Sequence, residues 1–205
     1  MAGSSLTRVT MTAAIVVLIT GAVAAEGAWA QSTGLPTFFA ATRAFRSSEL
    51  GVTLSRPGGD ATALEGRVGA ALDRADLALR AGYADAGGAG DGSFVAGVEA
   101  RVPVLGHGPT FPLDGAFILG VGRAFEDGGG ETFVPLGLSL GRRLLLDRRA
   151  LHLTPYVQPT VIFTGNSLFT LGFGVDAWIR GLPEVRVNWA AGDLDGFSVS
   201  LFWRR

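Results

Sequence analysis

The chain has 205 residues with 17 basic and 18 acidic side chains, a formal net charge of −1 and no cysteine, and every basic residue is arginine. The near-neutral charge excludes the basic face of a nucleic-acid-binding protein, and the absence of cysteine excludes disulfide scaffolds, zinc ribbons and thiol enzymes. Charged residues make up only 17% of the chain, against about 25% in an ordinary soluble domain. The chain therefore lacks the polar cover of a simple soluble protein.

Residues 1–30 have the pattern of a secretory signal peptide. The apolar run at 13–25 is too short for a membrane-spanning helix, which needs about 20 residues, and the small residues Ala28 and Ala30 suit a cleavage site. We expect an exported protein whose mature chain begins at Gln31. An uncleaved anchor helix is the alternative, disfavoured because glycine and glutamate interrupt the apolar stretch. No later run is long enough for a transmembrane helix.

Residues 31–47 carry three phenylalanines and two arginines, namely Phe38, Phe39, Phe45, Arg43 and Arg46. We expect a periplasmic tail here, with a short plug helix or a misread first strand as alternatives.

From residue 48 onward the dominant pattern is alternation with a period of two. Between Phe169 and Ile179, for example, large apolar residues alternate with small or polar ones. Because successive side chains of a strand point to opposite faces, this pattern predicts strands with one apolar face. Turns rich in Gly, Asp, Asn and Pro separate such segments. The predicted strands are 48–56, 61–72, 75–84, 93–104, 113–125, 132–143, 151–163, 167–179, 184–191 and 197–203.

Ten strands of about ten residues each, joined by hairpins, match the dimensions of a transmembrane β-barrel. A soluble barrel or sandwich would also alternate, but its polar face would meet water and be dense in charged residues. Here the polar face is mostly glycine with a few charges, which suits the crowded interior of a narrow barrel. We predict an all-β, up-and-down antiparallel transmembrane barrel of about ten strands, with eight possible, over residues 48–205.

A set of charged residues falls on the predicted inner face, where arginines and carboxylates can pair in a side-chain-filled lumen. This predicted lumen charge cluster comprises Glu65, Arg67, Arg80, Glu99, Arg101, Asp114, Arg142, Asp176 and Arg186. Aromatic residues near strand ends suggest interfacial girdles: Phe125, Phe133, Phe163, Phe169, Trp178, Trp189 and Trp203. Alternate turns also differ, one set being acidic and glycine-rich and the other arginine-rich. If the termini lie in the periplasm, the acidic set of turns is on the extracellular side of the membrane.

The signal peptide, the alternating strands and the closing segment from Phe197 to Trp203 resemble the small outer-membrane β-barrels of Gram-negative bacteria, the OmpA-like and OmpX-like barrels. The resemblance implies location in the outer membrane among its lipids, and recognition of an aromatic residue in the last strand by the barrel-assembly machinery. Phe202 or Trp203 would take that role, although Arg204 and Arg205 follow and depart from the family pattern. The match is to an architecture, so it carries over no active site.

Evidence for chemistry is sparse. His107 and His152 are the only histidines, and neither has metal-ligand spacing. We expect His107 to be an exposed turn residue. His152 and Thr154 are weak candidates for the base and the nucleophile of a lipid-modifying enzyme. We expect no cofactor and no nucleic-acid partner. The sequence favours a non-enzymatic, porin-like barrel with a structural or surface-interaction role and passage of small solutes at most. The alternatives are a lipid-modifying enzyme and a secreted soluble barrel that binds an apolar ligand.

Overall fold

The computed structural model describes residues 48–57, 61–85, 92–126, 129–146 and 151–204. They form one sheet of ten long strands and one short strand. In chain order the strands are β1 (Glu49–Pro57), β2 (Thr62–Ala71), β3 (Asp76–Asp85), β4 (Ser93–Leu105), β5 (Asp114–Glu126), β6 (Gly129–Gly141), β7 (Leu144–Leu146), β8 (Leu151–Phe163), β9 (Ser167–Ile179), β10 (Glu184–Gly192) and β11 (Gly196–Arg204).

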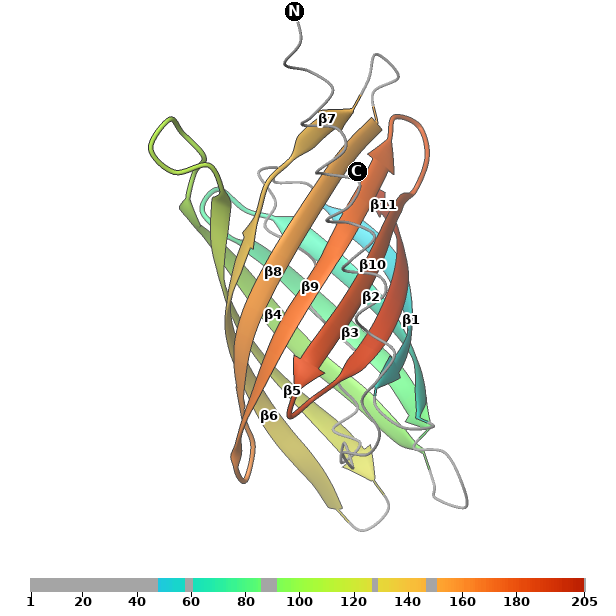
Figure 1. The fold of residues 1–205 in the computed structure, drawn as a ribbon. Coiled ribbons are helices and arrows are strands. Elements are labelled where there is room, and N and C mark those ends of the chain that lie inside the picture. The colour runs from blue at the N-terminus through green and yellow to red at the C-terminus, as the bar shows by residue number, and fades with distance from the viewer. Residues whose placement is uncertain (1–47, 58–60, 86–91, 127–128, 147–150, 205) are drawn as a thin grey trace, which may run out of the picture.

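The sheet closes on itself as an up-and-down barrel with tilted strands (Figure 1). Each long strand pairs antiparallel with its neighbours, and β1 pairs with β11 in an unbroken register from Glu49 opposite Arg204 to Pro57 opposite Gly196. Because β6 pairs with β8, the ring closes at this pair. The short β7 continues the line of β6 along the same edge of β8, with Gly141 opposite Tyr156 and Leu144 opposite Leu153. The ten long strands therefore confirm the predicted transmembrane barrel, and the count of ten rather than eight.

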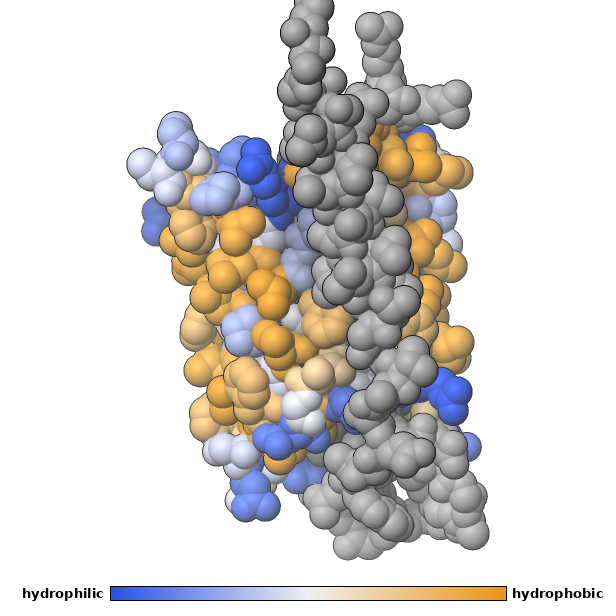
Figure 2. All heavy atoms as spheres, viewed as in Figure 1, coloured by the Kyte–Doolittle hydropathy of each residue, from blue (hydrophilic) through white to orange (hydrophobic). Residues whose placement is uncertain are grey.

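Side chains of the barrel wall alternate between a buried inner face and an exposed outer face, as β9 illustrates. Thr170, Gly172, Gly174 and Asp176 are buried, whereas the apolar residues between them are half-buried or exposed. Exposed Leu, Val and Phe residues occur around the described wall, with Leu79 63% exposed. Figure 2 shows this apolar surface across the middle of one face, with polar residues toward both ends.

This inside-out arrangement is what a barrel in hydrocarbon requires, since its apolar side chains face lipid. A soluble barrel that binds an apolar ligand would need the opposite arrangement. The soluble alternative is therefore wrong for this chain.

Two of the predicted girdle aromatics face inward. Phe133 is only 3% exposed and packs inside the barrel, and Trp178 has the inward parity of Asp176 on β9. The sequence interpretation grouped aromatics by their closeness to strand ends and did not apply the alternation to them. Phe125, Phe163, Phe169 and Trp203 are exposed, as a lipid interface needs.

The largest difference in strand boundaries concerns β6. The sequence predicts a strand at 132–143, but β6 spans Gly129–Gly141, and two residues separate it from β7. Arg142 lies in this break and is exposed, so its predicted place in the lumen is wrong. Arg142 directly follows Gly141, which is buried, so the alternation itself turns the Arg142 side chain away from the lumen.

No helix within the described ranges is long and apolar enough to span a membrane, a finding that does not bear on strands. The predicted signal peptide at 1–30 and the predicted tail at 31–47 lie outside the described residues.

A charge placed on the outer face should be costly. Leu79→Arg replaces an exposed leucine of β3, and near the middle of a bilayer such a change costs about 2–4 kcal/mol. We expect urea unfolding in lipid vesicles, followed by tryptophan fluorescence, to show this loss, while Leu79→Ala gives a smaller one. Equal stability of the arginine variant and the parent protein would contradict a lipid-facing surface at this position.

Candidate functional site: the interior of the barrel

The structure brings seven of the predicted lumen residues into the interior, each no more than 8% exposed: Glu65, Arg67, Arg80, Glu99, Arg101, Asp176 and Arg186. Asp114 is also buried, but it lies at the end of the barrel where β1 begins and β11 ends, here called the terminal end. There its carboxylate accepts a hydrogen bond from the His107 backbone N–H at 2.9 Å. Arg142 stays outside. Most of the predicted cluster therefore does meet inside the barrel.

Glu49 is the centre of the largest group of interior charges, although the sequence interpretation did not include it. Its Oε1 lies 2.8 Å from Arg67 Nη1 and 3.2 Å from Arg101 Nη2, and its Oε2 lies 2.8 Å from Arg186 Nη2. One carboxylate on β1 thus joins arginines of β2, β4 and β10. Glu99 strengthens the connection, since its Oε1 lies 3.2 Å from Arg67 Nη2 and 3.0 Å from Arg101 Nε.

Arg186 extends this group to the other side of the barrel. Its Nε lies 2.5 Å from Glu184 Oε1 and 3.6 Å from Asp176 Oδ2. The guanidinium carbon lies 3.7 Å from the centroid of the Phe202 ring, a cation–π contact. Glu184 also pairs with Arg204. We call Glu49, Arg67, Glu99, Arg101, Asp176, Glu184 and Arg186 the interior charge network.

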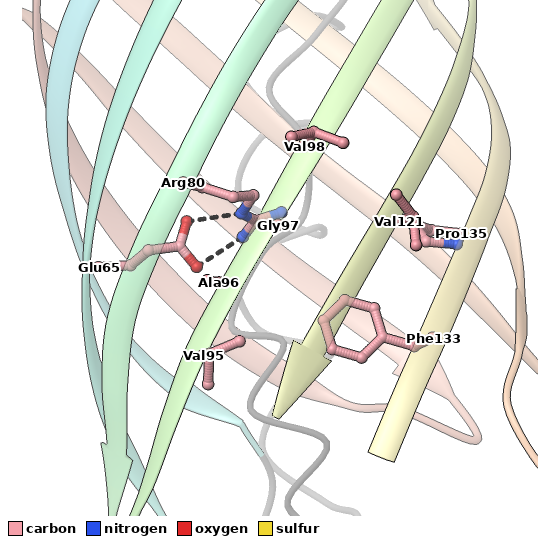
Figure 3. A pocket seen from close by; sticks show the side chains of 9 residues that line it. All are labelled: Glu65, Arg80, Val95, Ala96, Gly97, Val98, Val121, Phe133 and Pro135. Carbon is pink, nitrogen blue, oxygen red and sulfur yellow. Dashed lines mark hydrogen bonds and ion pairs between the residues drawn. The ribbon is translucent and has the colours of Figure 1, made fainter. Parts of the chain in front are cut away.

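A separate ion pair joins β2 and β3 deeper in the barrel. Arg80 donates from Nε and Nη2 to the two oxygens of Glu65, at 2.8 and 2.7 Å, in a bidentate arrangement. A cavity of about 10 Å³ lies beside this pair, which is room for about one water molecule. Figure 3 shows the ion pair on one side of the cavity and the Phe133 ring on the other.

Hydroxyl and amide groups occupy other parts of the inner wall. Thr53 donates to Ser200 at 2.8 Å across the β1–β11 closure, and Asn188 donates to Ser198 at 3.0 Å. Between β8 and β10 the inner face of β9 carries Gly174, where an added Cβ would lie 2.7 Å from the Tyr156 hydroxyl. Glycine is needed at this position because neighbouring polar side chains already occupy the space.

The opposite end of the interior is apolar. Six buried residues pack together there, named the apolar cap: Ala63, Ala84, Val95, Phe133, Ile162 and Leu194. Leu194 belongs to the β10–β11 turn, and its carbonyl accepts a 2.7 Å hydrogen bond from Thr170 Oγ1. The adjacent Asp193 accepts one from the Phe169 backbone N–H, also at 2.7 Å. These bonds hold the turn over the end of the barrel.

Glu49 and Glu184 are the interior carboxylates that sequence reasoning missed. Each is the first residue of its strand, and both lie within the predicted strands 48–56 and 184–191, but the lumen set did not extend to these strand ends. The alternation nevertheless contains the signal, because Glu184 shares the parity of Arg186 and Asn188, and Glu49 shares that of Thr53. Both side chains are almost completely buried, since Glu184 is 0% exposed and Glu49 is 4% exposed.

Neither histidine forms the arrangement expected of a catalytic base with a nucleophile. The His152 ring lies 4.9 Å from the Trp178 ring, its Nδ1 has no hydrogen-bond partner, and no described hydrogen bond joins it to Thr154. His107 Nδ1 lies 3.1 Å from Asp114 Oδ1, but that histidine is on a connecting segment, with a side chain 61% exposed. The described residues also contain no group of three or more His, Cys, Asp or Glu placed to hold a metal ion.

Comparisons with known proteins give structural matches only. No family model matches the chain, and no curated protein matches it. The β domain of the Bordetella autotransporter BrkA is similar with a TM-score of 0.45 and 16% identity, over 78% of this chain and 99% of that one. The N-terminal barrel of Pseudomonas aeruginosa OprF has a TM-score of 0.32 and 13% identity, over 77% of this chain and 98% of that one.

A protein described as a de novo designed transmembrane β-barrel has a TM-score of 0.35 and 11% identity, over 78% of this chain and 95% of that one. Similarity at this level carries no argument about function. The strand pairing and the outward apolar surface described above identify the architecture of an outer-membrane-type β-barrel.

Glu49 offers a direct test of the interior charge network. Glu49→Gln removes one charge from a buried group of three arginines, and breaking a buried pair typically costs about 3–5 kcal/mol. We expect denaturant unfolding to show a loss of this size. The control is Glu131→Gln, at a half-buried site near the opposite end, which should change stability by less than about 1 kcal/mol. Equal effects of the two changes would mean that the network does not stabilise the barrel.

Proposed function

We propose that this chain is a non-enzymatic β-barrel of the bacterial outer membrane, with a structural or surface-interaction role and passage of small solutes at most. The observation that supports this proposal is the filled interior. The interior charge network occupies the half where β1 begins and β11 ends, and the apolar cap covers the other end. A barrel filled in this way supplies a stable membrane-embedded wall and offers no wide aqueous path.

The location and partners belong to the same proposal. The apolar outer face supports contact with membrane lipids, and the predicted signal peptide supports export to the cell envelope. The barrel-assembly machinery would recognise the last strand, β11, where Trp203 is exposed and Phe202 points inward. The termini would face the periplasm, and the glycine-rich turns would face outward.

The lipid-modifying enzyme receives no specific support from the geometry. Its candidate base, His152, packs against Trp178 and lies within the electrostatic range of three arginines, Arg143, Arg180 and Arg204. A histidine that acts as a catalytic base needs a carboxylate to orient its ring, and none contacts this ring in the described structure. His152→Ala should therefore leave any turnover of labelled lipid A unchanged from that of the parent protein.

Planar-bilayer recording tests the filled interior. We expect the folded protein to give no steady current, because its interior is occupied by side chains. Large stepwise currents that disappear in a folded Gly174→Leu variant would contradict the proposal, since only an open lumen would be blocked by a bulkier inner residue. Heat-modifiable electrophoretic mobility, which reports a closed barrel, verifies that the variant has folded.

Cell fractionation tests the proposed location. The full-length chain, produced in a Gram-negative host, should appear in the outer-membrane fraction with its N-terminus at Gln31. Recovery as a soluble, monomeric periplasmic protein would contradict the proposal. The N-terminal residue is read by mass spectrometry of the purified protein.

A further inference from the structure

The two edges of β8 are paired in different ways. On one edge, every residue from Leu151 to Phe163 pairs with β9 in an unbroken register. On the other edge, the register with β6 covers residues 160–163, stops, and resumes at residues 156–157. Gln158 and Pro159, which lie between these stretches, have no registered partner on β6 within the described structure. One strand therefore has a continuous edge and an interrupted edge.

Two prolines of β8 explain the interruption. The Arg142 backbone N–H donates to the Pro155 carbonyl at 3.2 Å, so the backbone of Pro155 faces the β6 side. Alternate residues of a strand direct their N–H and C=O groups to opposite neighbours, so Val157 and Pro159 face β6 as well. Proline has no N–H to donate. Of these three positions, only Val157 therefore offers a donor to β6.

Pairing on both sides of this stretch holds β6 and β8 together. Toward the opposite end, the residues from Val134 to Gly137 pair with β8, and the apolar cap includes a residue of each strand. Toward the terminal end, Leu144–Leu146 of β7 pair with β8. We call the stretch in between, residues 138–142 and 155–159, the side window. It is a weakly paired part of the wall with firm pairing above and below it.

The interior charge network does not hold the side window closed. Its seven residues lie on β1, β2, β4, β9 and β10, and none lies on β6 or β8. Behind the window, the Tyr156 hydroxyl and Gln158 Oε1 are buried and have no hydrogen-bond partner in the described structure. Buried polar atoms of this kind gain free energy when a small hydrogen-bonding molecule reaches them.

Opening the side window breaks fewer backbone hydrogen bonds than opening an equal length of the β8–β9 pairing. Each hydrogen-bonded pair of a regular antiparallel ladder exchanges two bonds, whereas a pair that contains Pro155 or Pro159 can form only one. Broken backbone bonds are costly in a bilayer, because no water replaces them. The prolines therefore lower the cost of separating β8 from β6 relative to separating it from β9.

We propose that β6 and β8 separate reversibly at the side window while the rest of the ring stays paired. The opening faces lipid and admits small uncharged molecules to the inner face beside Tyr156 and Gln158. This inference goes beyond the proposed function, because a side opening leaves the apolar cap in place and provides no path from one end of the barrel to the other.

Amide hydrogen exchange, measured by NMR in the folded, detergent-solubilised protein, tests the opening. The Val157 N–H faces β6 and the Gln158 N–H faces β9, so one strand supplies both probe and control. We expect a protection factor about ten-fold lower at Val157, because its surroundings lack two hydrogen bonds. Equal protection of the two amides would overturn the proposal.

Pro159→Val restores a donor at the side window and should raise the protection factor of Val157 to within about three-fold of that of Gln158. The matched control is Pro103→Val, at an exposed proline of β4. It should leave the protection factor of Val157 within about two-fold of the parent value, since distant sites act independently. Equal effects of the two changes would contradict a role of Pro159 in the opening.

Cysteine labelling tests access to the interior, because the chain has no cysteine of its own. Ser139→Cys places a thiol on β6 at the side window, and Ser198→Cys places one on β11, where both serines are 0% exposed. In nanodiscs, N-ethylmaleimide should label the Ser139→Cys variant about ten-fold faster than the Ser198→Cys variant, by the same difference in local opening.

Adding Pro159→Val to the Ser139→Cys variant should slow its labelling, and this comparison keeps the reacting thiol the same. Heat-modifiable electrophoretic mobility verifies that each variant has folded. The proposal is overturned if the two cysteine variants are labelled at equal rates, or if Pro159→Val leaves the rate of the Ser139→Cys variant unchanged.

Discussion

Closure of the backbone hydrogen-bond ring is the constraint on which the rest of this structure depends. Hydrocarbon offers no partners for N–H and C=O groups, so a sheet in a membrane must leave no open edge within it. The β1–β11 and β6–β8 pairings meet this condition. Once the ring is closed, alternate side chains must face either lipid or a narrow interior, and this choice determines the chemistry of both faces.

The narrow interior creates the second requirement, which is that its charges compensate each other. Desolvated ions are expensive unless they are paired and hydrogen-bonded. Glu49 meets this need by joining three arginines from three strands, while Arg186 contacts carboxylates and the face of Phe202. The interior charge network therefore connects opposite walls of the barrel. At the other end, the apolar cap uses close packing to fill the same kind of space.

Much of this architecture could be predicted because alternation is a strong signal over long strands. It gave the ten crossings and the inward set from Glu65 to Arg186, but it must be applied residue by residue up to the end of each strand. Arg142 was placed in the lumen although it directly follows Gly141, which faces inward, and it is exposed. Glu49 was missed although it lies in the predicted strand 48–56 with the parity of Thr53. The pairing of His107 with Asp114 depends on the path of a turn, which composition does not reveal.

The pairing of the first strand with the last has a kinetic consequence. Thr53 and Ser200, which meet across this closure, are 147 positions apart in the chain. Such high contact order slows folding, because a long loop must lose entropy before the contact forms. Until then, the edges of β1 and β11 remain available to pair with another molecule. Pairing of β1 with β11 is thus the step at which productive insertion competes with aggregation. An assembly factor that shields these two edges would have its greatest effect before this pairing.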